Sequence, residues 1–140
     1  MLNVHNFYRQ SLLNGTEKRQ PQASRMPPMT WDETLAAKSQ THADKCVFAH
    51  SSTADRTDSR FYVGENLFAA SYNATNKEAV DAWFSEITSY VYATNSCSGV
   101  CGHYTQIVWA DSVYLGCARK YCPNNAAATK YIIVCQYGPG

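Results

Sequence analysis

Residues 131–135 read Tyr131-Ile132-Ile133-Val134-Cys135, an apolar run without a polar interruption. A strand with one face in water alternates apolar and polar side chains, whereas an unbroken apolar run is typical of a strand covered on both faces. We therefore expect this segment to lie in a sheet that is sandwiched between helices, which predicts an α+β fold.

The preceding apolar segment predicts a partner for this strand. Residues 115–122 and 131–137 are expected to form two strands joined around Pro123-Asn124-Asn125. If Cys122 and Tyr131 close the loop as an antiparallel pair, the register places Cys117 within one residue of the position opposite Cys135.

That register predicts a disulfide between Cys117 and Cys135, because the two Cα atoms then lie within bonding range. Cys122 is too far along the ladder to reach Cys135. The other four cysteines allow three pairings, and their spacing does not choose among them: Cys46, Cys97, Cys101 and Cys122.

Periodicity and capping signals predict three helices. Residues 2–13 carry apolar side chains at steps of three and four and end at Asn14-Gly15. Two T-x-x-E capping boxes predict the other helices, one beginning at Thr30 and one at Thr75. Residues 63–70 are expected to form a short strand. Residues 103–109 favour a strand by propensity alone, because they are rich in β-branched and aromatic side chains.

Composition limits the class of protein. The 140 residues are 45% hydrophobic, which predicts one folded domain over residues 1–140 rather than a disordered chain. Lys and Arg total 12 and Asp and Glu total 11, giving a net charge of +1. That balance argues against nucleic acid as a partner, and no apolar run approaches the roughly 18 residues of a membrane helix.

Six cysteines without a C-x-x-C pair argue against a zinc ribbon or a thioredoxin-like motif. Paired cysteines in an oxidising compartment are favoured instead, so we expect a secreted, extracellular protein stapled by three disulfides. The sequons at Asn14 and Asn73 agree with secretion and are candidate glycosylation sites.

Among residues that could carry chemistry, Glu86 stands out because helical spacing places it on one face with Trp83 and Tyr90. A carboxylate on an aromatic face needs a partner if it is buried, although the spacing alone slightly favours a Glu at the edge of the stripe with its head in water. Taken singly, His50, His103 and Glu65 are more typical of structural hydrogen bonding. No H-E-x-x-H motif or G-x-S-x-G elbow is present, so a binding role is favoured over catalysis.

Four segments in order resemble the signatures of the CAP superfamily, which includes cysteine-rich secretory proteins, venom antigen 5 and plant pathogenesis-related class-one proteins. The run from Cys97 to Pro123 is most similar to animal members of the glioma pathogenesis-related type. The matching segments are His5-Asn6-Phe7-Tyr8-Arg9, Gly64-Glu65-Asn66-Leu67, residues 101–112 and residues 132–139.

The resemblance implies an α-β-α sandwich around an antiparallel sheet, and it would make residues 103–109 a short helix. It implies the disulfides Cys46–Cys122, Cys97–Cys101 and Cys117–Cys135. No cysteine-rich C-terminal module is expected, and ion-channel blocking, which requires that module, is therefore not expected.

The resemblance also implies a central cavity lined by His50, Glu65, Glu86 and His103. Two neutral imidazoles with adjacent carboxylates are able to hold a divalent metal, with Zn²⁺ expected. The carboxylates would be either ligands or partners that fix each imidazole tautomer.

Lipid binding is the other property that the resemblance implies, with a sterol or a fatty acid as ligand. Phe84, Tyr90 and Tyr92 match the aromatic residues associated with sterol binding, although core packing is an equal alternative for them. Two other functions stay open. One is a protein-interaction module in defence, venom or immune modulation, whose loops 14–30 and 49–62 engage a receptor. The other is a metal-assisted hydrolase or protease using the His/Glu tetrad.

Overall fold

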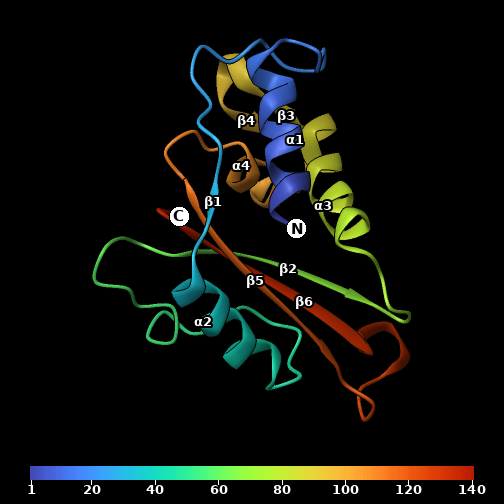
Figure 1. Cartoon of the computed structure of the whole chain (residues 1–140). Helices are drawn as coiled ribbons and strands as arrows, with labels where there is room; N and C mark the ends of the chain where they lie inside the picture. The colour runs from blue at the N-terminus through green and yellow to red at the C-terminus, as the bar shows by residue number, and fades with distance from the viewer.

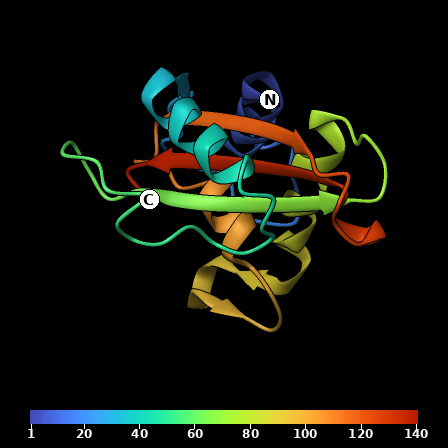
Figure 2. The ribbon, with the colours of Figure 1, turned by 90° about the horizontal axis from the view of Figure 1, so that it is seen from below.

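The computed structural model describes all 140 residues and contains a four-stranded sheet in the order β1-β5-β6-β2. The apolar run belongs to β6 (Tyr131–Gly138), which lies between β5 (Tyr114–Tyr121) and β2 (Gly64–Ala70) and is antiparallel to both. Figure 2 shows β6 in this inner position. The two-residue strand β1 (Thr30–Trp31) adds a short parallel edge beside β5. The expected covered strand is confirmed, because seven of the eight β6 residues are buried.

Helices cover both faces of the sheet, as expected for an α-β-α sandwich. Helix α2 (Glu33–Ala43) packs on one face, and α1 (Leu2–Leu13), α3 (Asn76–Phe84) and α4 (Gly102–Ile107) lie on the other (Figure 1). The larger core of 12 buried residues includes side chains from α3, α4 and β6, and a smaller core of five lies between α2 and the sheet.

Short elements connect α3 to α4. The 3₁₀ turns η1 (Ser85–Ser89) and η2 (Tyr92–Thr94) flank β3 (Tyr90–Val91), which pairs with β4 (Ser96–Cys97). A third 3₁₀ turn, η3 (Ala127–Thr129), lies in the β5–β6 connection. Glu86 and Tyr90 therefore do not share one α-helical face with Trp83, because the helix ends at Phe84.

The disulfides confirm the expected pairing. Cys117 faces Cys135 directly across the β5–β6 ladder. The strand register differs from the prediction by one position, because Tyr121 rather than Cys122 faces Tyr131. Cys122 lies just after the strand and is bonded to Cys46, and Cys97 is bonded to Cys101.

The two capping predictions had different outcomes. The box at the start of α3 is confirmed, with reciprocal hydrogen bonds between Thr75 and Glu78. The box at Thr30 is wrong. The backbone N–H of Thr30 donates to Val113 O at 2.8 Å, which keeps the residue in β1, and Asp32 instead caps α2 by accepting from Leu35 N.

Residues 103–109 form mainly the short helix α4, which corrects the strand predicted from propensity. The cause is a tertiary contact. The Glu86 carboxylate accepts hydrogen bonds from the backbone N–H groups of His103 at 2.9 Å and Tyr104 at 3.0 Å. These are first-turn N–H groups that have no partner within a helix, and an acidic group satisfies them well.

Candidate functional site

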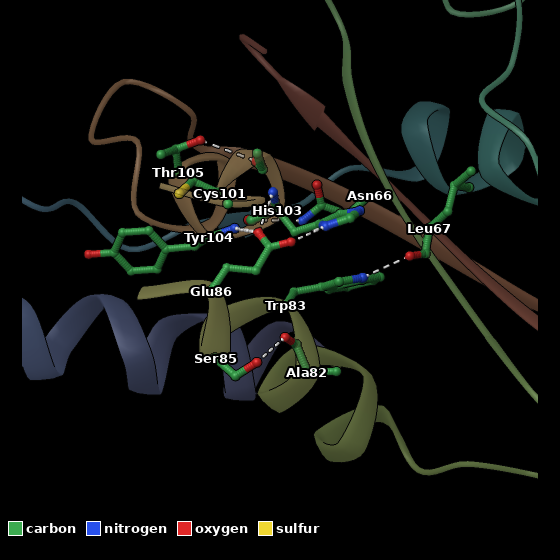
Figure 3. Close-up of polar contacts among 12 residues, drawn as sticks. Asn66, Leu67, Ala82, Trp83, Ser85, Glu86, Cys101, His103, Tyr104 and Thr105 are labelled. Atoms are coloured by element: carbon green, nitrogen blue, oxygen red, sulfur yellow. Dashed lines mark hydrogen bonds and ion pairs between the residues drawn. The ribbon is translucent and has the colours of Figure 1, made fainter. Parts of the chain in front are cut away.

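The first candidate pair is built where η1 meets α4. Glu86 Oε1 lies 2.6 Å from His103 Nδ1, while its other oxygen holds the start of α4 (Figure 3). Because an ionised carboxylate only accepts, the hydrogen of the neutral imidazole lies on Nδ1. His103 Nε2 therefore carries the lone pair, and no protein group hydrogen bonds to it.

Trp83 supports this pair from α3. Its indole N–H donates to Leu67 O on β2 at 2.8 Å, and its ring stacks on the His103 imidazole with centroids 6.1 Å apart (Figure 3). Both contacts restrict the orientation of the imidazole, which remains only partly exposed.

The second candidate pair lies at the edge of the sheet. His50 Nδ1 lies 3.0 Å from Glu65 Oε1, and the Glu65 side chain is fully buried. The Glu65 carboxylate also accepts from the N–H and the hydroxyl of Ser51 and from Gln136 Nε2, and Arg56 lies 3.5 Å away. Burial acts to raise the pKa of Glu65, but the hydrogen bonds from Ser51, Gln136 and His50 outweigh it and lower that pKa.

A series of hydrogen bonds links the strand that carries Glu65 to the backbone of His103. Asn66, which follows Glu65 on β2, donates to His103 O at 3.2 Å and to the Tyr137 hydroxyl at 3.0 Å. Tyr137 in turn lies 2.8 Å from His5 Nε2. His5 is fully buried and makes this long-range contact in addition to a local one to Met1 O.

The structure brings the four predicted residues together as two pairs rather than as one cluster. No group of three or more His, Cys, Asp or Glu side chains lies close enough to hold a metal. The two imidazoles nevertheless have the form expected of metal ligands, because each presents Nδ1 to a carboxylate and leaves Nε2 free. Glu65 already accepts several hydrogen bonds, so the contacts favour the orienting role over the ligand role for this carboxylate.

A separate groove of about 750 Å³ lies between the loop after α1, the β3–η2 region and the end of α4. Tyr90 and Tyr92, two of the three predicted ligand-binding aromatics, line it together with Val108 and Trp109. The Gln20 amide joins the two sides, because it donates to Tyr90 O at 2.5 Å and accepts from Tyr92 N at 3.2 Å.

Phe84, the third predicted aromatic, is a core residue. Its side chain is 2% exposed and stacks on the Tyr8 ring with centroids 3.9 Å apart. It does not line the groove, so the alternative of core packing describes it.

Sequence reasoning did not single out Arg9, which links the loop after α1 to the segment that follows α4. Its side chain is 1% exposed and donates to four backbone carbonyls rather than to a carboxylate. Burial lowers the pKa of Arg9 to about 10. The acceptors belong to the loop after α1 and to the end of α4 with the residues that follow it: Pro27, Ile107, Trp109 and Ala110. An arginine on the inner face of a predicted helix was the available signal, because a buried guanidinium must find acceptors.

The family model described as the cysteine-rich secretory protein family, CAP, matches residues 2–137. The chain belongs to the CAP family. The fold, the three disulfides and the His/Glu pairs derived above all lie within the matched residues.

Individual relatives agree with this assignment. GLIPR1-like protein 1 of Homo sapiens is 42% identical over 127 residues, covering 87% of this chain and 52% of that protein. Scoloptoxin SSD976 of Scolopendra dehaani is 37% identical, covering 100% of this chain and 67% of the toxin. Venom allergen-like protein 4 of Schistosoma mansoni superposes with a TM-score of 0.87 at 30% identity, covering 99% of this chain and 85% of that one.

This CAP chain spans about half the length of GLIPR1-like protein 1 from human and cattle. None of its helices combines the length and apolarity needed to span a bilayer.

Proposed function

We propose that this CAP domain is secreted and binds a small hydrophobic molecule, a sterol or a fatty acid, in the groove beside α4. The observation that carries the proposal is the groove itself, with Tyr90, Tyr92, Val108 and Trp109 on its walls. Its volume of about 750 Å³ falls in the range typical of sites for small organic ligands, about 300–1,000 Å³.

The exposure of Tyr92 supports the same proposal. This side chain is 65% exposed, although a tyrosine ring gains free energy when its apolar faces leave water. A lipid tail along the groove would cover the ring and replace water on the apolar wall, and the burial of apolar area supplies the driving force.

We propose in addition that His50 and His103 hold a divalent metal, with Zn²⁺ as the expected ion. Each imidazole offers Nε2, while Glu65 and Glu86 fix its tautomer from the other side. A solved structure of NaASP2, 30% identical to this chain, contains Zn²⁺. A bound ion would act as a Lewis acid, and water would complete its coordination, since the structure has no group of three or more His, Cys, Asp or Glu side chains that could hold a metal.

Equilibrium binding of radiolabelled cholesterol and palmitate tests the lipid proposal. We expect saturable binding of at least one ligand, weakened about tenfold by Tyr92→Ser and unchanged by Tyr62→Ser. Tyr62 is the matched control, because it is 79% exposed and does not line the groove. Absence of saturable binding, or equal loss in both variants, contradicts the proposal.

Calorimetric titration with Zn²⁺ tests the metal proposal independently. We expect binding that is lost in the His50→Ala/His103→Ala double variant and retained in His42→Ala. His42 is a suitable control because it is buried and uses Nε2 for a hydrogen bond to Ala49 O. Equal Zn²⁺ affinity in the double variant and the native chain overturns the metal proposal.

A further inference from the structure

On the sheet face that α3 covers, strands β5 and β6 extend beyond the first residue of that helix. Arg119 faces Ile133 across the ladder, and Tyr121 faces Tyr131 two residues further along. Side chains two residues apart on a strand point to the same face. Ile133 belongs to the core beneath α3, so Tyr121 and Tyr131 lie on the same face, beyond the start of that helix.

These two tyrosines border a second hollow, of about 190 Å³, at the β5–β6 turn. Their ring centroids are 4.9 Å apart, and Tyr121 is 52% exposed. Phe68 and Ile133 contribute apolar surface at its inner end, and Asn73 stands at its border. The hollow therefore places two aromatic rings near a group attached to the Asn73 side chain.

Asn73 lies in the connection from β2 to α3, which passes beside the β5–β6 turn in both ribbon views (Figures 1 and 2). Its side-chain oxygen accepts from Arg119 Nη1 at 2.9 Å. Arg119 also donates to Ala74 O and Asn76 Oδ1, which fixes the loop around Asn73. The Asn73 amide nitrogen has no protein partner, and it is the atom that an N-glycan modifies.

We propose that Asn73 carries an N-linked glycan whose first N-acetylglucosamine packs against Tyr121 and Tyr131. Attachment joins C1 of the sugar to the Asn73 amide nitrogen and breaks the bond from C1 to the diphosphate of a lipid-linked oligosaccharide donor. The diphosphate leaves with the electron pair, and the amide gives up one proton. The C–H face of the sugar ring then covers the aromatic faces, which carry partial negative charge.

In the folded domain, the capping box of α3 engages a side chain of the Asn73 sequon. The hydroxyl of Thr75, the third residue of the sequon, accepts from Glu78 N at 3.1 Å and donates to Glu78 Oε2 at 2.8 Å. The glycosyl transfer machinery of the secretory route requires that hydroxyl. Because the capping box engages this hydroxyl once α3 has formed, we expect the unfolded chain to be modified faster than the folded domain.

Asn14 supplies an internal comparison. Its sequon lies at the end of α1, where Asn14 Oδ1 accepts from the N–H and the hydroxyl of Thr16. Asn14 does not line the hollow. A glycan there has no aromatic surface from the hollow to cover, and we expect it to leave stability unchanged.

The experiment uses an Asn14→Gln chain secreted from a eukaryotic host under a supplied leader and trimmed enzymatically to one sugar. The same chain made in a bacterial periplasm is the unglycosylated reference. We expect mass spectrometry to find the sugar on Asn73 and the melting temperature to rise by about 3 °C. The rise should vanish in Asn14→Gln/Tyr121→Ser, with Asn73 still modified, and should be absent when an Asn73→Gln chain carries the sugar on Asn14.

An unmodified Asn73 in the secreted chain overturns the proposal, and so does a rise that persists in the Tyr121→Ser background or appears equally with Asn14. The proposal rests on secretion, which belongs to the proposed function, but the leader supplies secretion in the test. Its failure is distinguishable from failure of lipid binding, because the tyrosines that border the hollow do not line the groove.

Discussion

Arg9 is a buried cation that requires several hydrogen-bond acceptors around it. Its guanidinium bridges the loop at Pro27 and the carbonyls of Ile107, Trp109 and Ala110. Methionine fills similar space but donates no hydrogen bond, so Arg9→Met leaves several carbonyls unsatisfied. We expect the free energy of unfolding to fall by about 3 kcal/mol or more, measured by urea denaturation.

Arg25→Met is the matched control for Arg9. Arg25 pairs with Asp111 at 2.7 Å, and both side chains are well exposed. Exposed ion pairs contribute about 0–1 kcal/mol, so this variant should unfold close to the native midpoint. Similar midpoints for the two variants would contradict the role assigned to Arg9.

Because His5 is buried in its neutral form, we expect the protein to lose stability in mild acid. Burial lowers its pKa from 6.5 to about 4, so below pH 6.5 the unfolded chain takes up a proton that the folded chain resists. The contribution of His5 is complete above pH 6.5 and is lost as the pH falls toward 4, by about 3 kcal/mol. Urea unfolding at pH 7 and pH 4.5 measures this loss, and His5→Gln should reduce it. An unchanged pH dependence in that variant would rule out His5 as the source.

Individual site residues were predictable only where a motif carried them. The resemblance named His50, Glu65, Glu86 and His103, and the structure pairs them through Nδ1 contacts. Spacing along the chain did not reveal these pairs, because 15 and 17 residues separate their members. The buried role of Arg9 was missed for the same reason, since its acceptors are distant in sequence.

At the level of the helix, two residues are alternative candidates for the N-cap of α2, Thr30 from the sequence motif and Asp32 from the structure. Asp32 accepts from Leu35 N and pairs with Arg60, whereas Thr30 lies in β1. We expect Asp32→Ala to lower the free energy of unfolding by about 1–2 kcal/mol. Thr30→Ala should change it by at most about 0.5 kcal/mol. Thermal unfolding of the two variants measures the difference. A larger loss of stability from Thr30→Ala than from Asp32→Ala would favour the T-x-x-E capping box at Thr30.

Elements with local signals were predictable, and those fixed by distant contacts were not. The capping box at Thr75 and the β5–β6 hairpin follow from neighbouring residues, and both are confirmed. Helix α4 was not predictable from propensity, because the Glu86 carboxylate that holds its first turn lies on another element. The predicted cap at Thr30 was wrong for the same reason, because its backbone pairs with the distant strand β5 before α2 begins.

Across the whole molecule, the disulfides should contribute unequally to stability. Cys46–Cys122 links residues 76 positions apart, whereas Cys97–Cys101 spans only four. Loop-closure entropy predicts a loss of roughly 4 kcal/mol when the first pair is replaced by alanine and roughly 2 kcal/mol for the second. Guanidinium unfolding of the two double variants measures the difference. An equal loss from both pairs, or a larger loss from the short loop, would contradict this ranking.

The molecule has three separate candidate surfaces: the His/Glu pairs, the groove beside α4 and the hollow at the β5–β6 turn. Of these surfaces, we propose the groove as the lipid site. A crystal structure of the protein saturated with palmitate or cholesterol would locate the bound ligand. We expect ligand density between Tyr92 and Trp109, whereas ligand density located elsewhere, or a groove filled only by water at saturation, would rule out the groove as the lipid site.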